Sequence, residues 1–335
     1  MKAFAGTRAV LALVLSMLLA AAGAAAGTAS DGRDGGHDGN RCGGHHHGHG
    51  SGHDRDRDRD KCKLSKDEIS VQLWTFSSYI GFGSEPENQQ RLEETLAGLS
   101  EIGYRNVEPY DFNGLTAEEF KALLRKYDLR APSRHGDTTE ATWDQHLADA
   151  SVLRQKYTGS GGFAAPGIDS YEDTLATAET LNRLGKRSVR NGTGPIFGHN
   201  HQGEFRTMHE DPETGELKSA WQIMVENTNP RYVAFQLDLL WAVDGGADPV
   251  ELLRKYPKRI QLLHMKDGVN VADPVDATPV PMGEGEMEFE PILRAAEKAK
   301  IRYYVYEQDP MFDDPNYDPF ASAQAGWDYL STVRF

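Results

Sequence analysis

The sequence has 335 residues and a formal net charge of −15 at pH 7, with 51 acidic side chains against 36 lysines and arginines. Nucleic-acid binding needs stripes of basic side chains that contact phosphates, so this balance argues against a nucleic-acid partner. No basic amphipathic segment indicates a membrane partner, and we expect no stable membrane insertion of the mature chain. A small neutral or cationic molecule remains as the expected ligand.

The first 26 residues have the pattern of a signal peptide. Lys2 and Arg8 supply a positive start, residues 9–22 are apolar, and residues 24–26 offer small side chains for cleavage. We therefore expect residues 1–26 to be removed and the mature protein to be secreted or periplasmic. A retained membrane anchor is the weaker alternative, because the apolar run is rich in alanine and is followed by glycine and serine.

Residues 27–65 change sharply in composition, to glycine, aspartate, histidine and arginine. Such a segment buries too little apolar surface to offset the entropy lost on ordering, which predicts a disordered low-complexity linker. It holds half of the 12 histidines, a pattern typical either of a metal-scavenging tail or of a solvated spacer. We favour the solvated spacer.

The only two cysteines, Cys42 and Cys62, lie in this linker. In an exported chain such a pair is more often joined than free, although the sequence leaves this disulfide open. No cysteine follows residue 62, which excludes a cysteine nucleophile and cysteine-ligated zinc from the rest of the chain.

Residues 66–335 have a length that suits one α/β barrel, and short apolar runs alternate there with helical stretches. The predicted strands cover residues 69–74, 104–107, 129–132, 194–199, 232–238, 259–264 and 302–307, and a glycine-rich stretch, residues 158–167, replaces a clean fourth strand. The predicted helices cover residues 86–102, 116–127, 139–157, 171–184, 217–227, 249–256, 288–300 and 319–333. Eight such alternations predict a single (β/α)8 TIM barrel, of the α/β class.

The last four predicted strands each end in a side chain that binds metals. Because the strand C-termini of a barrel converge on one face, these side chains are expected to lie together. Two imidazoles and two carboxylates suit one divalent Mn, Zn, Fe or Co ion better than Ca, which prefers oxygen ligands. The alternative is that each is an ordinary capped or salt-bridged strand end. The four predicted ligands are His199, Asp238, His264 and Glu307.

Ligating imidazoles usually have a partner for their second ring nitrogen. Asp267 and Glu204 lie near enough in the sequence to be considered for this role.

Five spaced motifs resemble those of the sugar phosphate isomerase/epimerase family, also called xylose-isomerase-like TIM barrels. Residues 199–205 match its His-Asn-His-x-x-Glu-Phe motif, and the other motifs follow in the family's order. The further matching stretches are residues 237–249, 263–267, 283–286 and 306–309. The resemblance covers most of residues 71–330. It implies the barrel fold and a metal site, but it leaves the substrate open because the family includes isomerases, epimerases, dehydratases and lyases.

The resemblance implies one divalent ion held by Glu, Asp, His and Glu at the ends of strands five to eight. Asp238, His264 and Glu307 match three of these positions. His199 departs from the pattern, because many relatives have a glutamate there. Either His199 or Glu204 is then the first ligand, and the sequence does not choose between them.

The chemistry implied is that of a sugar isomerase or epimerase acting on a keto-sugar through a metal-stabilised enediolate. The metal would polarise the carbonyl and Glu307 would remove the neighbouring proton. Lys266 would add positive charge, and Glu204, His201 or Lys266 would be the second acid or base. A one-base reaction is also open.

The remaining polar and aromatic residues near strand ends are expected to contact the small-molecule sugar. Glu108 and His135, after the second and third strands, would bind hydroxyl groups, and His201 would lie beside them. Trp241, with Trp74 and Phe82, would form an apolar wall. The alternative is that they are ordinary strand-end, core or rim residues.

Three other functions are compatible with parts of this sequence. The first is a metal-dependent lyase or hydrolase of 3-keto-glycosides. Such a substrate is more compatible with an exported enzyme than a phosphorylated intracellular sugar is. An apurinic endonuclease is disfavoured, because the Asp-x-x-His of those enzymes is Asp238-Leu239-Leu240-Trp241 here. A non-catalytic secreted sugar- or metal-binding protein is disfavoured because Glu307 and Lys266 are present. The sequence leaves the oligomeric state open.

Overall fold

The computed structural model describes residues 62–271, 277–310, 314 and 316–335. The predicted signal peptide and nearly all of the predicted linker, residues 27–65, lie outside this range. Cys62 already packs on the barrel, since its backbone N–H donates to Phe335 O at 2.7 Å and its carbonyl accepts from Phe335 N at 3.1 Å. Cys62 is disulfide-bonded, and its expected partner Cys42 lies outside the described residues.

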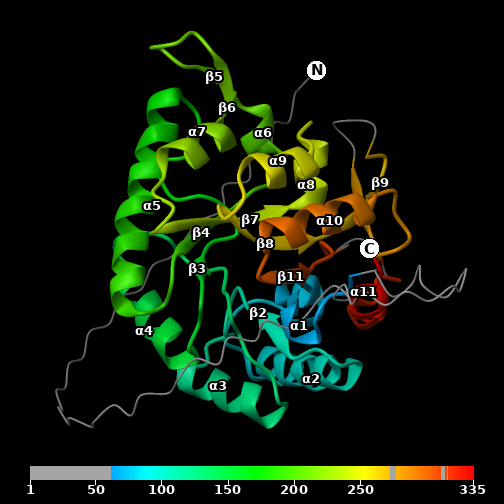
Figure 1. Cartoon of the computed structure of the whole chain (residues 1–335). Coiled ribbons are helices and arrows are strands. Elements are labelled where there is room, and N and C mark those ends of the chain that lie inside the picture. Colours follow the sequence, from blue (N-terminus) through cyan, green and yellow to red (C-terminus); the bar gives the residue numbers. More distant parts are fainter. Residues whose placement is uncertain (1–61, 272–276, 311–313, 315) are drawn as a thin grey trace, which may run out of the picture. The chain divides into compact units, whose positions relative to one another are not determined.

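The centre of the fold is a parallel sheet in the order β2-β1-β11-β8-β7-β4-β3 (Figure 1). The extended segment 130–135 lies between β2 and β3. Arg130 N donates to Arg105 O at 2.9 Å, Arg130 O accepts from Val107 N at 2.9 Å, and Gly136 N donates to Gly159 O at 2.8 Å. This segment takes the third strand position and joins the two edges of the sheet. The predicted TIM barrel is therefore confirmed.

The strands of the barrel are short. They are β1 (Ile69–Gln72), β2 (Asn106–Glu108), β3 (Thr158–Gly159), β4 (Ile196–His199), β7 (Val233–Asp238), β8 (Ile260–Met265) and β11 (Tyr303–Tyr306). Two antiparallel hairpins are added, β5 (Met208–Glu210) with β6 (Leu217–Ser219) and β9 (Asp267–Val269) with β10 (Thr278–Val280).

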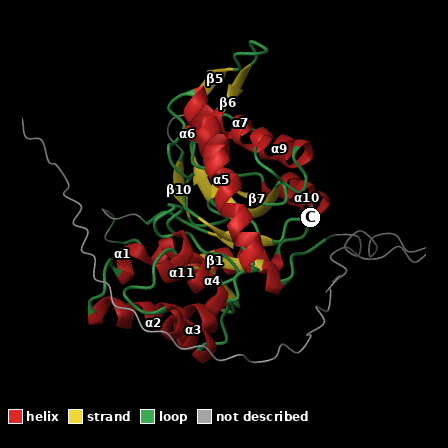
Figure 2. Cartoon of the chain, turned by 90° about the vertical axis from the view of Figure 1, so that its left-hand side faces the viewer, coloured by secondary structure: helices red, strands yellow, loops and turns green. Residues whose placement is uncertain are grey.

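Helices surround these strands, and Figure 2 shows the long helix α5 across their outer face. The helices are α1 (Ser77–Ile80), α2 (Pro86–Ile102), α3 (Ala117–Lys126), α4 (Trp143–Leu153), α5 (Tyr171–Asn191), α6 (Gly203–Arg206), α7 (Ala220–Asn227), α8 (Leu239–Asp244), α9 (Pro249–Lys255), α10 (Phe289–Ala299) and α11 (Pro319–Thr332), with 3-10 turns at Lys66–Glu68 and Leu73–Phe76. Among the described residues, no helix is both long enough and apolar enough to span a bilayer.

The predicted helices are largely confirmed, and capping explains where they begin. The α2 bounds agree with the prediction, and Thr116 forms the expected capping box with Glu119 before α3. The prediction was wrong at residues 217–219, which form β6. Ser219 then accepts a hydrogen bond from Gln222 N at 3.1 Å, so the helix α7 begins only after this N-cap.

The barrel interior has an apolar layer beneath a polar one. Side chains alternate between the two faces of a strand, so residues two apart on one strand both point inward. Phe197, Ala234 and Leu262 pack together with Tyr157 as a separate buried cluster. Two residues further along the same strands come His199, Gln236 and His264, all buried. The apolar layer closes the barrel below these polar side chains, away from the strand C-termini.

One buried histidine lies outside this interior and makes the stability of the fold depend on pH. The His146 ring, on α4, packs 4.8 Å from the Trp143 ring, and its Nε2 has no hydrogen-bond partner among the described residues. Burial, together with the nearby positive charge of Arg134, lowers the pKa of His146 to about 4.

We predict that the protein loses stability as the pH falls from 6.5 to 4, because the unfolded chain then binds a proton that folded His146 excludes. The loss from this group is about 3 kcal/mol at its largest. His146→Gln should remove that part of the pH dependence in urea unfolding measured between pH 7 and pH 4. His209→Gln, at a half-buried histidine on β5, is the control; equal pH profiles for the two variants would contradict the assignment.

Candidate active site

Three of the four predicted metal ligands meet at the C-terminal ends of β7, β8 and β11. One donor atom from each of Asp238, His264 and Glu307 lies within 4.8 Å of the others, and all three side chains are buried. His264 Nδ1 is 2.9 Å from Glu307 Oε2 and 3.8 Å from Asp238 Oδ2. The order of the strands in the sheet therefore brings together residues that are up to 69 positions apart in the sequence.

The other nitrogen of His264 is held by Glu108, at the end of β2. His264 Nε2 is 2.9 Å from Glu108 Oε1. The same carboxylate accepts from Gln72 Nε2 at 2.9 Å, from Gln236 Nε2 at 2.9 Å and from the Ser133 hydroxyl. Glu108 thus orients the imidazole, and it does so from the barrel interior, where it is fully buried.

Burial disfavours the charged form of each ionisable group in the site. In most of these groups, the neighbouring charges and hydrogen bonds together affect the pKa more than burial does. For Glu108, the imidazoles of His135 and His264 overcome burial and lower the pKa. For His264, burial is overcome by Glu307 and Glu108, which raise the pKa to about 10. Glu307 has a pKa well below its ordinary value, because Lys266 and His264 overcome its burial. The pKa of Asp238 is raised, because burial dominates there.

Asp267, a candidate partner for a ligating imidazole, does not contact His264. Its carboxylate faces the loop before α10 and accepts four backbone hydrogen bonds. The donors are Gly268 N at 2.9 Å, Gly283 N at 2.9 Å, Gly285 N at 3.1 Å and Met287 N at 3.2 Å. The motif at residues 283–286 is therefore a loop anchored to the first residue of β9.

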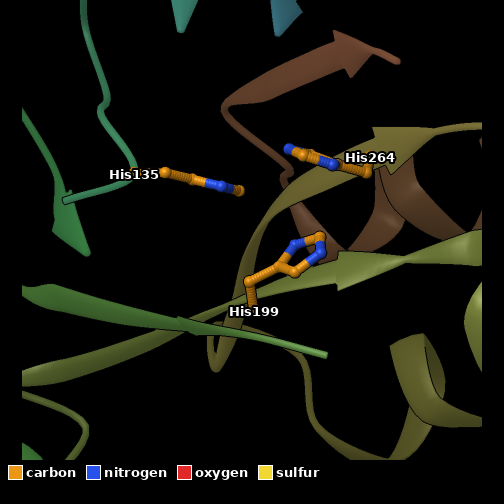
Figure 3. A group of neighbouring side chains, drawn as sticks. All are labelled: His135, His199 and His264. Atoms are coloured by element: carbon orange, nitrogen blue, oxygen red, sulfur yellow. The ribbon is translucent and has the colours of Figure 1, made fainter. Parts of the chain in front are cut away.

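A second group of possible ligands consists of three imidazoles, those of His135, His199 and His264 (Figure 3). The His199 ring centre is 4.5 Å from that of His264 and 5.0 Å from that of His135. Gln236 Oε1 lies between them, 2.7 Å from His135 Nε2 and 3.1 Å from His199 Nδ1. Burial and the neighbouring imidazoles lower the pKa of His199 well below its ordinary value. His199 therefore belongs to the imidazole side of the site.

Lys266 is buried between carboxylates at the upper edge of the site. Its Nζ is 3.1 Å from Asp238 Oδ2, 2.8 Å from Glu307 Oε2 and 2.8 Å from Asp309 Oδ2. Although burial disfavours the ammonium ion, Asp238, Asp309 and Glu307 raise the pKa of Lys266 well above its ordinary value. The Asp309 side chain is 30% exposed, so this residue connects the buried charges with solvent.

The remaining predicted site residues lie at the rim. His201 is exposed, and its ring centre is 5.1 Å from that of His199 and 6.5 Å from that of Trp241. The Trp241 ring centre lies 5.2 Å from Lys266 Nζ. Glu204 accepts a hydrogen bond from His201 N at 2.8 Å and is in neither group of possible ligands. The roles predicted for these three residues stay predictions.

Four residues of the site were not predicted from the sequence: Gln236, Gln72, Ser133 and Asp309. Gln236 had a signal, because it precedes Asp238 by two positions and must share its face of β7. Gln72 likewise ends β1 on the inward face. For Ser133 and Asp309 only the folded chain shows which charged groups they meet.

The donor set fits a divalent metal ion. Asp238 Oδ2 is buried and has no hydrogen-bond partner among the described residues, although the Lys266 ammonium group lies 3.1 Å away. An imidazole and two carboxylates at this spacing are ligands for Mn, Zn, Fe or Co.

The sequence profile of the xylose isomerase-like TIM barrel family matches residues 96–311. The chain belongs to this family. The matched region contains every residue of both groups of possible ligands. The predicted family and the prediction of an isomerase- or epimerase-like enzyme are confirmed. A lyase activity is also compatible with this family.

Individual relatives agree with this membership. An inosose dehydratase of Clostridium perfringens is 26% identical over 288 residues, which cover 72% of this chain and 90% of that protein. An inosose dehydratase of Clostridium botulinum is 29% identical over 285 residues, which cover 72% of this chain and 89% of that protein. A sugar phosphate isomerase/epimerase structure from Parabacteroides distasonis has a TM-score of 0.65 at 22% identity, covering 80% of this chain and 98% of that chain. The structural likeness shows the fold.

We predict that Asp267→Ala lowers the free energy of unfolding by about 3 kcal/mol, because buried backbone donors of the loop lose their acceptor. Asp318→Ala is the matched control, since Asp318 accepts from two backbone N–H groups at the start of α11 and its loss should cost about 1 kcal/mol. Urea unfolding of both variants measures the difference. Equal losses would show that Asp267 does no more than an ordinary N-cap.

Proposed function

We propose that this enzyme removes a proton from the carbon next to the carbonyl group of a polyhydroxylated ketone, such as a keto-sugar or keto-inositol. The observation that carries this proposal is the buried group of Asp238, His264 and Glu307, with Lys266 against its two carboxylates. The curated relatives named inosose dehydratase support a substrate of this kind.

The residues that would hold the divalent ion are Asp238, His264 and Glu307. Such an ion would polarise the substrate carbonyl as a Lewis acid. Glu108 fixes His264 in the orientation that ligation needs, because it holds Nε2 and leaves Nδ1 directed at Glu307 and Asp238.

Glu307 is the proposed base. Its hydrogen bonds and ion pairs with described residues all use Oε2, which leaves Oε1 to take a proton from the substrate. A lowered pKa keeps the carboxylate charged near neutral pH. The ammonium group of Lys266 would stabilise the negative charge that develops on the substrate oxygen as the proton leaves.

Elimination is favoured over epimerisation by one feature of the site. Epimerisation needs two opposed bases, and the family's first carboxylate is replaced by His199, on the imidazole side. A dehydratase or lyase needs instead an acid that protonates the leaving hydroxyl or alkoxyl group. The lowered pKa of His199 keeps its imidazole neutral, and His201, whose ring centre is 5.1 Å away, is the residue that could supply this proton. The relatives named as inosose dehydratases agree with this choice. Epimerisation remains the second candidate, because the first step is the same.

We predict that Glu307→Gln lowers proton exchange by about 10²–10⁴-fold and abolishes metal binding. The measurement is deuterium uptake next to the carbonyl of keto-inositols and keto-hexoses, together with metal content. The full chain is used with the histidines of residues 37–53 replaced by alanine, so that they do not bind metal themselves. His264→Ala should lose the metal as well.

Glu204→Gln is the control, since this carboxylate is in neither ligand group. Loss of metal in Glu204→Gln would make Glu204 the first ligand. Full proton exchange in Glu307→Gln would overturn the proposed base, and a metal-free wild type with full exchange would overturn the metal site.

Lys266 shares its two innermost carboxylates with the proposed metal, so we predict that Lys266→Met binds Mn or Zn about tenfold more tightly. When a metal ion binds Asp238 and Glu307, the ammonium group of Lys266 can move toward Asp309, which already lies 2.8 Å away. Asp309→Asn should therefore weaken metal binding in the wild type and have little effect in Lys266→Met. Titration calorimetry on the four proteins measures this coupling. If Asp309→Asn changes the metal affinity equally in the wild type and in Lys266→Met, Asp309 acts only through its charge and not through Lys266.

A further inference from the structure

We propose that three aromatic side chains at the mouth of the barrel bind a second ring of the substrate, so that the enzyme acts on a glycoside rather than on a free monosaccharide. The aromatic patch consists of Trp74, Phe82 and Tyr110. The inference rests on the proposed function for the position of the first ring, which lies against the group of Asp238, His264 and Glu307.

The aromatic patch lies directly beside the buried site. Trp74 follows β1 by two residues and Tyr110 follows β2 by two residues, so both lie at strand C-termini. Trp74 N donates to Gln72 Oε1 at 3.2 Å, and Gln72 Nε2 donates to Glu108 Oε1 at 2.9 Å. Two hydrogen bonds thus connect the aromatic patch with the carboxylate that orients His264.

The three rings pack against one another at interplanar angles of 51°, 84° and 62°, and Phe82 is the exposed member of the group. The Trp74 ring centre lies 5.2 Å from that of Tyr110 and 5.9 Å from that of Phe82, and the Phe82 and Tyr110 centres are 6.5 Å apart. Phe82 is 56% exposed to solvent. An exposed phenylalanine backed by two further rings offers a flat apolar face of the kind that stacks on the C–H face of a sugar or on an aryl ring.

Phe82 is held in place by its neighbours. Asn88 Nδ2 donates to Phe82 O at 2.8 Å, and Asn113 Nδ2 donates to Gly81 O and Gly83 O at 3.2 Å each. Gly81 and Gly83 have φ values of +83° and +94°, which a side chain would strain. The loop therefore presents the ring without needing to be ordered by the ligand, which lowers the entropy cost of binding.

The aromatic patch also offers a polar contact. The Tyr110 hydroxyl is buried and has no hydrogen-bond partner among the described residues. A buried hydroxyl without a partner loses the hydrogen bonds it would make with water, and a ligand oxygen can restore one of them. Stacking on a ring with one hydrogen bond at its edge is how a glycosyl or aryl group is bound.

The charges nearby exclude one kind of second group. Asp111 follows Tyr110, and Glu85 lies next to the loop of Phe82, with its carboxylate bonded to Asn88 Nδ2 at 3.0 Å. These carboxylates would repel a phosphate. Among the described residues, the other exposed large apolar side chains are Met208 and Leu217, on the hairpin β5–β6, which extends away from the barrel in Figures 1 and 2.

The test compares two unreactive probes, p-nitrophenyl β-D-glucoside with two rings and methyl β-D-glucoside with one. Affinity and saturation-transfer NMR are measured on the full chain and on Phe82→Ala, Tyr110→Phe and Leu217→Ala. We expect the two-ring probe to bind about tenfold more tightly, with saturation transferred to its aryl protons. Phe82→Ala should remove most of this advantage and Tyr110→Phe part of it, whereas Leu217→Ala, at an exposed leucine elsewhere, should leave it unchanged.

Equal affinities for the two probes would overturn the proposal, as would an aryl advantage that survives Phe82→Ala or no binding of the two-ring probe at all. The same titrations on Glu307→Gln separate this inference from the proposed function. If Glu307→Gln still binds the two-ring probe more tightly and still catalyses the reaction, only the proposed base is overturned. A reaction that needs Glu307 without any aryl advantage overturns the aromatic patch alone.

Discussion

The imidazole of His264 lies between two buried carboxylates, and the polar interior of the barrel is arranged around this contact. Its Nδ1 is 2.9 Å from Glu307 and its Nε2 is 2.9 Å from Glu108. Charges taken out of water are costly unless they are paired and hydrogen-bonded. The amides of Gln72 and Gln236 satisfy the remaining acceptors of Glu108, and Lys266 balances Glu307. Each of these polar residues is therefore explained by the need to satisfy the others.

The site is divided into two sides that share His264. The carboxylates of Asp238 and Glu307 form one side, which is suited to a divalent ion and to proton removal. His135 and His199 form the other, with Gln236 between them. The charged carboxylate of Glu307 can act as a base at neutral pH, while the neutral imidazole of His199 can hydrogen-bond a substrate oxygen. Under the proposed function, His199 in place of a carboxylate would favour elimination over epimerisation after the shared first step.

Outward from the buried site, the chain becomes progressively more open to solvent. Lys266 is buried, Asp309 is partly exposed, and Phe82 is largely exposed. Charge is thus concentrated where water is excluded and electrostatic forces are strong, while flat apolar surface lies at the mouth. This gradient suits a substrate whose reacting ring enters first and whose remaining part stays near the surface.

The barrel and the grouping of Asp238, His264 and Glu307 were predictable from the sequence, because apolar strands that end in ligand side chains are local patterns. The helix α2 and the capping box at Thr116 were predictable as well, since capping depends on neighbours three residues apart. That Glu108 holds His264 and that Asp267 anchors a loop is known only from the folded chain. Those contacts join β2 to β8 and β9 to the loop before α10. A carboxylate at a strand end can point toward either neighbouring segment. The partner is chosen by which buried donors need an acceptor, and the position of those donors exists only in the folded chain.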